Sequence, residues 1–199
     1  MPYKEVISSF NLTSLCYNPF AIARVELRTR SGGEPSSLKL FDPVRWFYFK
    51  NMDVSYFMDL ALLEAKKAKE EGEIPVGAVI VKDGTPIAFG HNKKESKFDI
   101  SSHAEIEAIK EAGRVLKKTD LSDCSIFVTL EPCLMCGGAL KQSRIKSIYY
   151  GAKDTQFGFE SRYGLFSIKD NYPSPLVYGG IKEKECKEII DDFFATKRR

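Results

Sequence analysis

The sequence is poor in histidine, tryptophan and cysteine: its 199 residues include two histidines, one tryptophan and five cysteines. An odd, small number of cysteines argues against a disulfide framework and favours metal-binding or buried thiols in a reducing compartment. No apolar run approaches the roughly 20 residues that span a membrane, and no signal-peptide core opens the chain. We therefore expect a cytoplasmic protein without a membrane segment.

A general excess of basic charge is also missing from most of the chain. Residues 1–51 hold seven of the 30 Lys and Arg residues and four of the 27 Asp and Glu residues, so residues 52–199 hold 23 of each. The formal net charge of +3 therefore belongs entirely to the first 51 residues. A site for a polyanion such as nucleic acid would have to be a local patch of residues.

Residues 1–51 form an N-terminal extension of unknown role. They lack a sustained helical period and contain RSGGEPSS, a polar turn cluster. We favour Met52 as the true start, with this segment upstream of the protein; an organelle-targeting segment and a genuine extension are the alternatives. Four acidic residues count against targeting. Residues 52–199 are predicted to form one folded domain.

The pattern along residues 52–199 alternates helices and strands, which predicts an α/β layered domain with a mixed sheet flanked by helices. Helix caps are assigned to Ser101 or Ser102 and to Gly113, and Pro132 suits a first helical turn. The predicted helices cover 56–70, a segment from the capping serines to Ala112, 132–143 and 182–195. The predicted strands cover 76–81, 86–92, 124–130, 145–152 and 176–178.

Two cysteines three positions apart stand out in the segment PCLMC. Cys133 and Cys136 follow Pro132, so both thiols are expected near a helix start and on one helix face. The partial positive charge of a helix N-terminus favours thiolates, which are ligands that zinc prefers. This pair alone leaves a redox motif or a buried packing pair open.

His103, in SHAEIEAIKEAG, provides a third ligand type at the predicted start of another helix. If the two helix starts face each other, His103, Cys133 and Cys136 leave a fourth position for water, as in catalytic zinc sites. Glu105 would then be a free carboxylate placed to take up and deliver a proton. A capping or core histidine and an ordinary first-turn glutamate are the alternatives.

The combined pattern H-A-E…P-C-x-x-C is the signature of zinc deaminases. At these residues the chain resembles the bacterial-type (TadA type) tRNA-specific adenosine deaminases of the cytidine/deoxycytidylate deaminase superfamily. The resemblance runs from about Tyr56 to the C-terminus. It includes EIPVGAVIV, Asn92, HAEIEAI, VTLEPCLMCGGAL, SRIKSIYYGAKD and GGIKEKECKEIIDDFF.

The resemblance implies a cytidine-deaminase-like three-layer fold with a five-stranded mixed sheet between helices. It implies hydrolytic deamination of adenosine to inosine at the wobble position of a tRNA anticodon by a zinc-activated water, an RNA-editing step. His103, Cys133 and Cys136 would bind one Zn²⁺ per subunit, and Glu105 would be the catalytic proton carrier. The expected partners are the anticodon stem-loop and a second copy of the chain in a homodimer.

Substrate-binding residues follow from the same resemblance. Asn92 would hydrogen-bond the nucleoside, Asp154 would lie near its sugar–phosphate, and Val76 and Ala104 would line the pocket. The backbone of Glu131 is a candidate partner for the leaving amine. The structural alternatives are a loop asparagine, a turn aspartate, simple packing and a helix-capping glutamate.

Candidate RNA contacts are local basic and aromatic residues, because the domain as a whole is neutral. They are Lys93, Lys94, Arg144, Lys153, Phe194, Lys197 and Arg198. Solvated surface charges and a core phenylalanine pair are the alternatives. Residues 155–175 depart from the family's usual loop, in a region that helps to hold the anticodon loop.

Two other functions share some of these residues. A free nucleobase or nucleoside/nucleotide deaminase, of guanine or cytosine type, would use the same zinc ligands. A zinc module without catalysis would also keep the ligands, although the presence of Glu105 speaks against it.

Overall fold

The computed structural model describes residues 54–165, 168 and 171–197. The helices are α2 (Val54–Glu70), α3 (Lys94–Lys97), α4 (Ala104–Leu116), α5 (Leu134–Gln142) and α6 (Glu183–Lys197). The strands are β1 (Gly77–Lys82), β2 (Thr85–His91), β3 (Cys124–Leu130), β4 (Ser147–Ala152) and β5 (Leu176–Tyr178). Within these residues, no helix has the length and apolar character needed to cross a membrane.

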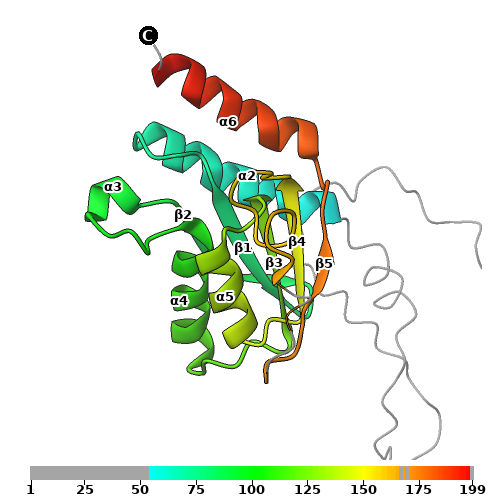
Figure 1. Cartoon of the computed structure of the whole chain (residues 1–199). Coiled ribbons are helices and arrows are strands. Elements are labelled where there is room, and N and C mark those ends of the chain that lie inside the picture. Colours follow the sequence, from blue (N-terminus) through cyan, green and yellow to red (C-terminus); the bar gives the residue numbers. More distant parts are fainter. Residues whose placement is uncertain (1–53, 166–167, 169–170, 198–199) are drawn as a thin grey trace, which may run out of the picture. The chain divides into compact units, whose positions relative to one another are not determined.

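The strands form one five-stranded sheet in the order β2-β1-β3-β4-β5 (Figure 1). β1 runs antiparallel to β2 and to β3, whereas β3, β4 and β5 are parallel to one another. The connection from β3 to β4 passes through α5, since parallel neighbours require a crossover segment. The predicted mixed sheet is confirmed.

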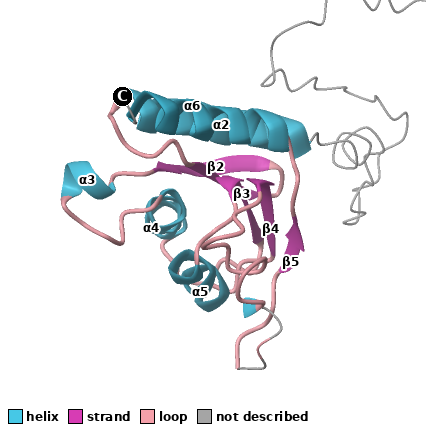
Figure 2. Cartoon of the chain, turned by 45° about the horizontal axis from the view of Figure 1, so that its top comes forward, coloured by secondary structure: helices cyan, strands magenta, loops and turns pink. Residues whose placement is uncertain are grey.

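Helices cover both faces of this sheet because successive strand residues point to opposite sides. Ala78 and Ile80 belong to the apolar core that includes residues of α4 and α5, whereas Val79 and Val81 belong to a second core with residues of α2. Figure 2 shows α2 and α6 on one side of the sheet, with α4 and α5 on the other. The expected three-layer α/β architecture is thus confirmed.

The strand directions bring three loops to one edge of the sheet. Because β2 and β3 both run antiparallel to β1, they are parallel to each other, and β4 runs in the same direction. Asn92 directly follows β2, Glu131 directly follows β3, and Lys153 directly follows β4. Ligand sites in α/β proteins lie outside the carboxyl ends of strands, so this edge is the place to look for a site.

The start and end of α4 differ from the sequence prediction. Ser101 and Ser102 do not cap it, because their hydroxyl groups donate to the carboxylate of Asp99 at 2.7 and 2.9 Å. His103 is the N-cap residue, without a side-chain hydrogen bond to the helix backbone. Gly113 lies inside the helix instead of ending it. The imidazole of His103 therefore remains available for contacts beyond α4.

Candidate metal and catalytic site

α4 carries His103 to the sheet edge because the helix packs directly on β2. Gly90 permits this approach: a Cβ atom there would lie 2.3 Å from the carbonyl oxygen of Ala104 and 2.5 Å from the amide nitrogen of Ala108. The backbone of His103 is extended, and its carbonyl oxygen accepts a hydrogen bond from the N–H of Glu107 at 3.0 Å. The imidazole is consequently fixed to the end of a helix that is held against the sheet.

α5 carries both cysteines at its start, slightly later than the sequence predicted. Pro132 precedes the helix, Cys133 is its N-cap residue and Cys136 lies in its first turn. The carbonyl oxygen of Cys133 already accepts a helical hydrogen bond, from the N–H of Gly137 at 2.8 Å. The shifted boundary therefore leaves the two thiols together at the helix start, as expected.

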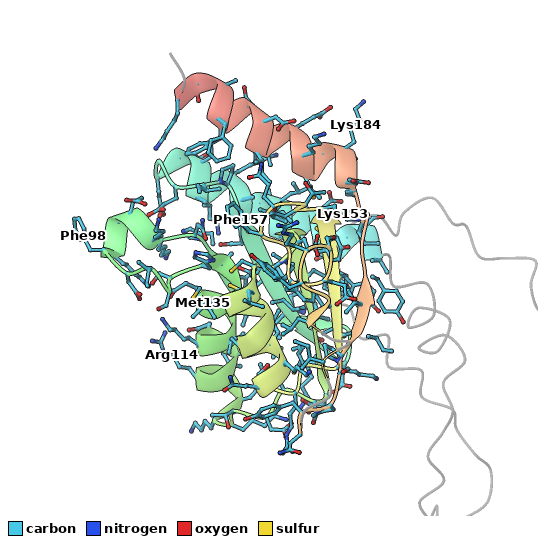
Figure 3. All side chains as sticks on the ribbon, viewed as in Figure 1. Phe98, Arg114, Met135, Lys153, Phe157 and Lys184 are labelled. Atoms are coloured by element: carbon cyan, nitrogen blue, oxygen red, sulfur yellow. The ribbon has the colours of Figure 1, made fainter. Side chains whose placement is uncertain are left out.

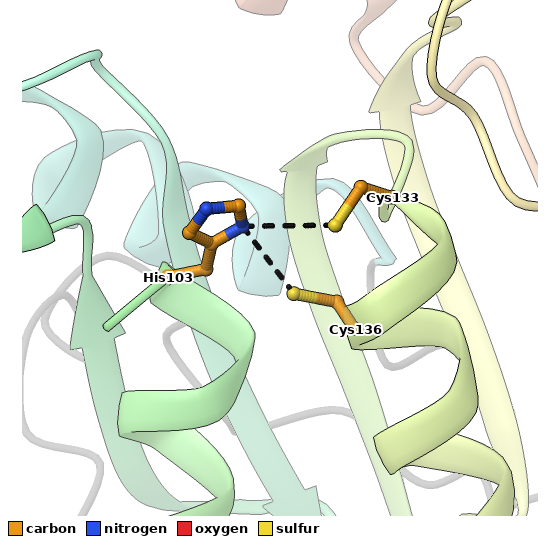
Figure 4. A group of neighbouring side chains, drawn as sticks. All are labelled: His103, Cys133 and Cys136. Atoms are coloured by element: carbon orange, nitrogen blue, oxygen red, sulfur yellow. Dashed lines mark hydrogen bonds between the residues drawn. The ribbon is translucent and has the colours of Figure 1, made fainter. Parts of the chain in front are cut away.

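Three side chains from the two helix starts meet in a compact group (Figure 4). The Nδ1 atom of His103 lies 3.5 Å from Sγ of Cys136 and 3.7 Å from Sγ of Cys133, and the three atoms lie within 4.8 Å of one another. A tetrahedral zinc ion, with bonds of about 2.3 Å to sulfur and about 2.0 Å to nitrogen, would separate such ligands by roughly 3.5 Å. The spacing fits this ion. No other such group of histidine, cysteine and acidic side chains occurs among the described residues.

The thiols of this group titrate very differently. The pKa of Cys133 is lowered to about 4, chiefly by a hydrogen bond with the Cys136 thiol and further by His103 beside it. The pKa of Cys136 is raised, because its thiol gives that hydrogen bond and because it is buried. Interaction with Cys133 raises the pKa of His103. Zinc binds thiols in their deprotonated form, so its binding here would release the protons that these side chains hold.

Glu105 occupies the first turn of α4, two residues after His103, and its side chain is buried with 3% exposed. Burial raises the pKa of its carboxyl group to about 7. A group that titrates near neutral pH can both accept and release a proton. A positive ion beside the carboxylate would lower its pKa.

Asn92 joins the end of β2 to the start of α4. Its side-chain oxygen accepts a hydrogen bond from the N–H of Ala104 at 3.3 Å, and its own N–H donates to the carbonyl oxygen of Val76 at 3.2 Å. Val76 and Ala104 are buried members of one core. The three residues predicted to surround the substrate are therefore neighbours. The side-chain nitrogen of Asn92 makes no hydrogen bond within the described chain, which leaves a donor for a ligand.

The side chain of Glu131 fastens a loop, which the sequence did not reveal. Its buried carboxylate accepts hydrogen bonds from the backbone N–H groups of Asp154, Glu160 and Ser161 at 3.0, 3.2 and 2.8 Å. The hydroxyl group of Ser161 donates a fourth, at 2.6 Å. The backbone N–H of Glu131 donates to the carbonyl oxygen of Ala152 at 2.8 Å. The side chain does not cap α5, so that alternative is wrong, and the predicted backbone role toward the leaving amine stays a prediction.

Asp154 shapes a tight turn within the loop that Glu131 holds. Its carboxylate accepts hydrogen bonds from the N–H groups of Gln156 and Phe157 at 2.9 and 3.0 Å, and its carbonyl oxygen accepts one from Gly158 at 3.0 Å. These contacts match the alternative of a turn residue, and the role near the sugar–phosphate stays a prediction. Phe157, at the tip, has 60% of its surface exposed. The sequence pointed to it only through the departure of residues 155–175 from the family pattern.

Three of the predicted RNA-contacting residues lie at the edge that carries the metal ligands. Lys93 and Lys94 follow Asn92, and Lys153 is exposed directly after β4. Arg144 lies elsewhere: it comes after the far end of α5 and pairs with Asp120 at 3.4 Å. The structure therefore does not bring Arg144 to the metal ligands.

The candidates near the C-terminus are partly used within the molecule. The amino group of Lys197 donates to the carbonyl oxygen of Gly72 at 3.2 Å and lies 4.9 Å from the ring centre of Phe193. Phe193 is buried, whereas 39% of Phe194 is exposed. Arg198 lies outside the described residues. Phe194 remains a candidate on α6, and Lys197 could contact RNA only beside the contacts that it already makes with Gly72 and Phe193.

The fold and the His-Cys-Cys group define a class of protein, the zinc-type nucleobase deaminases. The family model described as the cytidine and deoxycytidylate deaminase zinc-binding region matches residues 52–152. The chain belongs to the cytidine and deoxycytidylate deaminase family. The family resemblance predicted from the sequence is confirmed.

Within this family, the chain is similar to proteins named as tRNA-specific adenosine deaminases. The chain is 43% identical over 145 residues to a tRNA-specific adenosine deaminase of Agrobacterium fabrum, covering 72% of this chain and 95% of the relative. It is 41% identical over 152 residues to a tRNA-specific adenosine deaminase of Aquifex aeolicus, covering 74% and 97%. A structure solved in a study of A-to-I editing by tRNA:A34 deaminases shares 43% identity and a TM-score of 0.66, covering 68% of this chain and 99% of the other.

Proposed function

We propose that this protein deaminates adenosine to inosine at the wobble position of a tRNA anticodon. One observation supports this function most: His103, Cys133 and Cys136 meet beside a buried Glu105, in a chain more than 40% identical to tRNA-specific adenosine deaminases. The reaction consumes one water and releases one ammonia for each adenosine converted.

His103, Cys133 and Cys136 would hold one Zn²⁺ per subunit. Their N and S atoms suit zinc, and three protein ligands leave one position for water. When bound, zinc supplies a water nucleophile that is acidified to a pKa of roughly 7. The two helix starts contribute by fixing the ligands in advance, so little reorganisation is needed.

Glu105 would carry the protons of the reaction. Its carboxylate would accept one proton from the attacking water and deliver it to N1 of the adenine ring. It would then take the second proton from the hydroxyl group added at C6 and deliver it to the amino group, which leaves as ammonia. Asn92 would donate its side-chain N–H to the nucleoside and so orient the base beside Glu105. Val76 and Ala104 would form apolar walls, and the backbone of Glu131 would face the leaving amine.

The tRNA anticodon stem-loop would bind at the sheet edge that carries the metal ligands. Lys93, Lys94 and Lys153 flank this edge from two loops and provide charge for phosphates. Phe194, Lys197 and Arg198 would extend the contact along the C-terminal helix. Arg144 is the weakest of the candidates because it comes after the opposite end of α5.

We further propose a homodimer that acts in the cytoplasm, with residues 52–199 as the deaminase domain. Exposed apolar side chains at the start of α5, Leu134 and Met135, are suited to a subunit contact. The four described cysteines are free thiols, which suits a reducing compartment. Residues 1–51 would be dispensable for catalysis.

The deciding experiment incubates the full chain with an anticodon stem-loop that carries a wobble adenosine. Inosine at that position, with one zinc per subunit by elemental analysis, is the expected result. Free adenosine, guanine and cytidine serve as competing substrates. Turnover of a free base or nucleoside without inosine in the stem-loop would contradict this function and favour the other deaminase class.

A further inference from the structure

The loop of residues 154–161 is attached to the metal-binding helix at several points. Gly158 pairs with Cys133 in an antiparallel bridge, and the N–H of Phe159 donates to the carbonyl oxygen of Pro132 at 2.8 Å. Phe159 is fully buried, and a Cβ atom on Gly137 would lie 2.8 Å from its side chain. Paired residues have Cα atoms about 5 Å apart, so Gly158 of this loop lies directly beside the metal ligand Cys133.

Glu131 makes the loop rigid from the inside. Its four hydrogen bonds reach Asp154, at the beginning of the turn, and Glu160 and Ser161, at its end. A side chain at Gly158 would collide with this carboxylate, since a Cβ atom there would lie 2.5 Å from its Oε2 atom. The tip of the loop is therefore held from both sides by one buried group.

This rigid tip presents an aromatic ring to solvent. The backbone N–H of Phe157 is bonded to Asp154, while 60% of the residue is exposed and its ring contacts no other aromatic ring among the described residues. Figure 3 shows Phe157 in the same part of the domain as Met135, at the start of α5, and Lys153. An exposed ring on a fixed turn costs solvation energy and offers a flat face at a defined place.

We propose that Phe157 forms a base-stacking subsite, and that Glu131 is the residue that positions it. A base that enters the metal site must leave its stack, so the adjacent base loses a stacking partner. Phe157 directly precedes Gly158, which pairs with Cys133. Its ring would take the place of the lost stacking partner. Lys153, exposed before the turn, provides charge for the adjoining phosphate. This inference rests on the proposed RNA substrate and adds a contact for the nucleotide beside the deaminated one.

The test compares Phe157→Ala, Phe157→Leu and Phe157→Trp with the native chain on the anticodon stem-loop. Loss of one stacked base should raise KM and Kd by about 10- to 100-fold in the alanine and leucine variants, with kcat and zinc content retained. The tryptophan variant should keep native values because it restores an aromatic face. Phe89→Ala is the matched control, because Phe89 is also an exposed phenylalanine, 43% exposed on β2. The KM of this variant should equal that of the native chain.

Stem-loops with an abasic nucleotide on either side of the target adenosine identify the partner base. At one of the two positions, the abasic nucleotide should weaken binding by the native chain as much as Phe157→Ala weakens binding to the intact RNA. The same abasic RNA should bind Phe157→Ala no more weakly than the intact RNA does. Glu131→Gln alone should raise KM. Added to Phe157→Ala in a double variant, it should raise KM no further, whereas a purely structural role of Glu131 would raise KM in both cases.

Several results would overturn the inference. Stacking would be excluded if Phe157→Ala kept the native KM, or if Phe157→Leu bound the RNA as well as the native chain. It would also be excluded if an abasic nucleotide lowered the affinity of the native chain and of Phe157→Ala equally. Dissociation of a dimer by Phe157→Ala would assign the ring to a protein contact instead. If the native chain forms no inosine in any stem-loop, the proposed function fails and this inference fails with it. Inosine formation with an unaffected Phe157→Ala variant rejects the stacking subsite alone.

Discussion

Glu105 combines deep burial with a place beside the metal ligands, which suits a group that handles protons. We predict that Glu105→Gln keeps the shape of the side chain but lowers kcat by about 10²- to 10⁴-fold, because an amide cannot accept or deliver the proton. Single-turnover inosine formation measures the loss, and elemental analysis should still find zinc. Native turnover by this variant would contradict the assigned role.

The three ligand side chains should be separable from the remaining cysteines by their effect on metal content. Cys136→Ala and His103→Ala should each lower zinc below one equivalent per subunit, since two ligands do not complete a tetrahedral site. Cys124→Ala and Cys186→Ala are the controls, because both residues are buried outside the metal group. Zinc loss in the control variants, with zinc retained in the others, would move the site elsewhere.

The ligand group could be predicted from the sequence because few residue types bind zinc and this chain has few of them. Two histidines and five cysteines leave little choice, and both ligand segments open helices. The role of the Glu131 side chain could not be predicted. Its partners lie 23 to 30 residues away and are mostly backbone N–H groups, which every residue possesses.

At the scale of elements, the loop held by Glu131 makes a steric prediction. Gly158→Ala should lower the free energy of unfolding by about 1–3 kcal/mol, as overpacking does. It should also raise KM, because the new Cβ atom would meet Asp154 and Glu131. Denaturant titration and stem-loop kinetics measure the two effects.

Gly138→Ala provides the matched control in the neighbouring helix. Nothing lies within 4 Å of a Cβ atom placed there, and alanine favours a helix interior over glycine by about 1 kcal/mol. The control should be neutral or slightly stabilising. Equal damage from both substitutions would show that the loop contact has no special importance.

Strands were more predictable than helix starts. β3 has the predicted bounds to the residue, because CSIFVTL is a mainly apolar segment rich in residues that favour strands. The predicted N-cap of α4 was wrong, because the hydroxyl groups of Ser101 and Ser102 donate to Asp99. α3 was not predicted at all: four polar residues show no period, and the buried carboxylate of Glu73 holds this turn by accepting from Glu95 and Ser96.

For the whole molecule, metal binding should contribute to stability. A ligand present at 1,000 times its Kd stabilises the folded state by about 4 kcal/mol, and each kcal/mol corresponds to about 2–4 °C in a domain of this size. Removing zinc with a chelator should therefore lower Tm by about 8–16 °C, and adding zinc back should restore it. Calorimetry on the native chain and on His103→Ala tests this, since the variant should not respond.

A chain that begins at Met52 should retain the fold and the activity. The family match begins at this residue. We expect the same Tm and the same kcat/KM for the stem-loop as with the full chain. A truncated chain that aggregates or loses activity would assign a structural role to residues 1–51.

The single carboxylate of Glu131 anchors both ends of the turn that carries Phe157, and the contacts of this loop with the metal-binding helix come from Gly158 and Phe159. Residues 155–157 can therefore be exchanged as a cassette without redesigning the reaction centre. Grafting other tips between the same two anchor points is a direct route to altered nucleotide context, for an engineer as for natural selection.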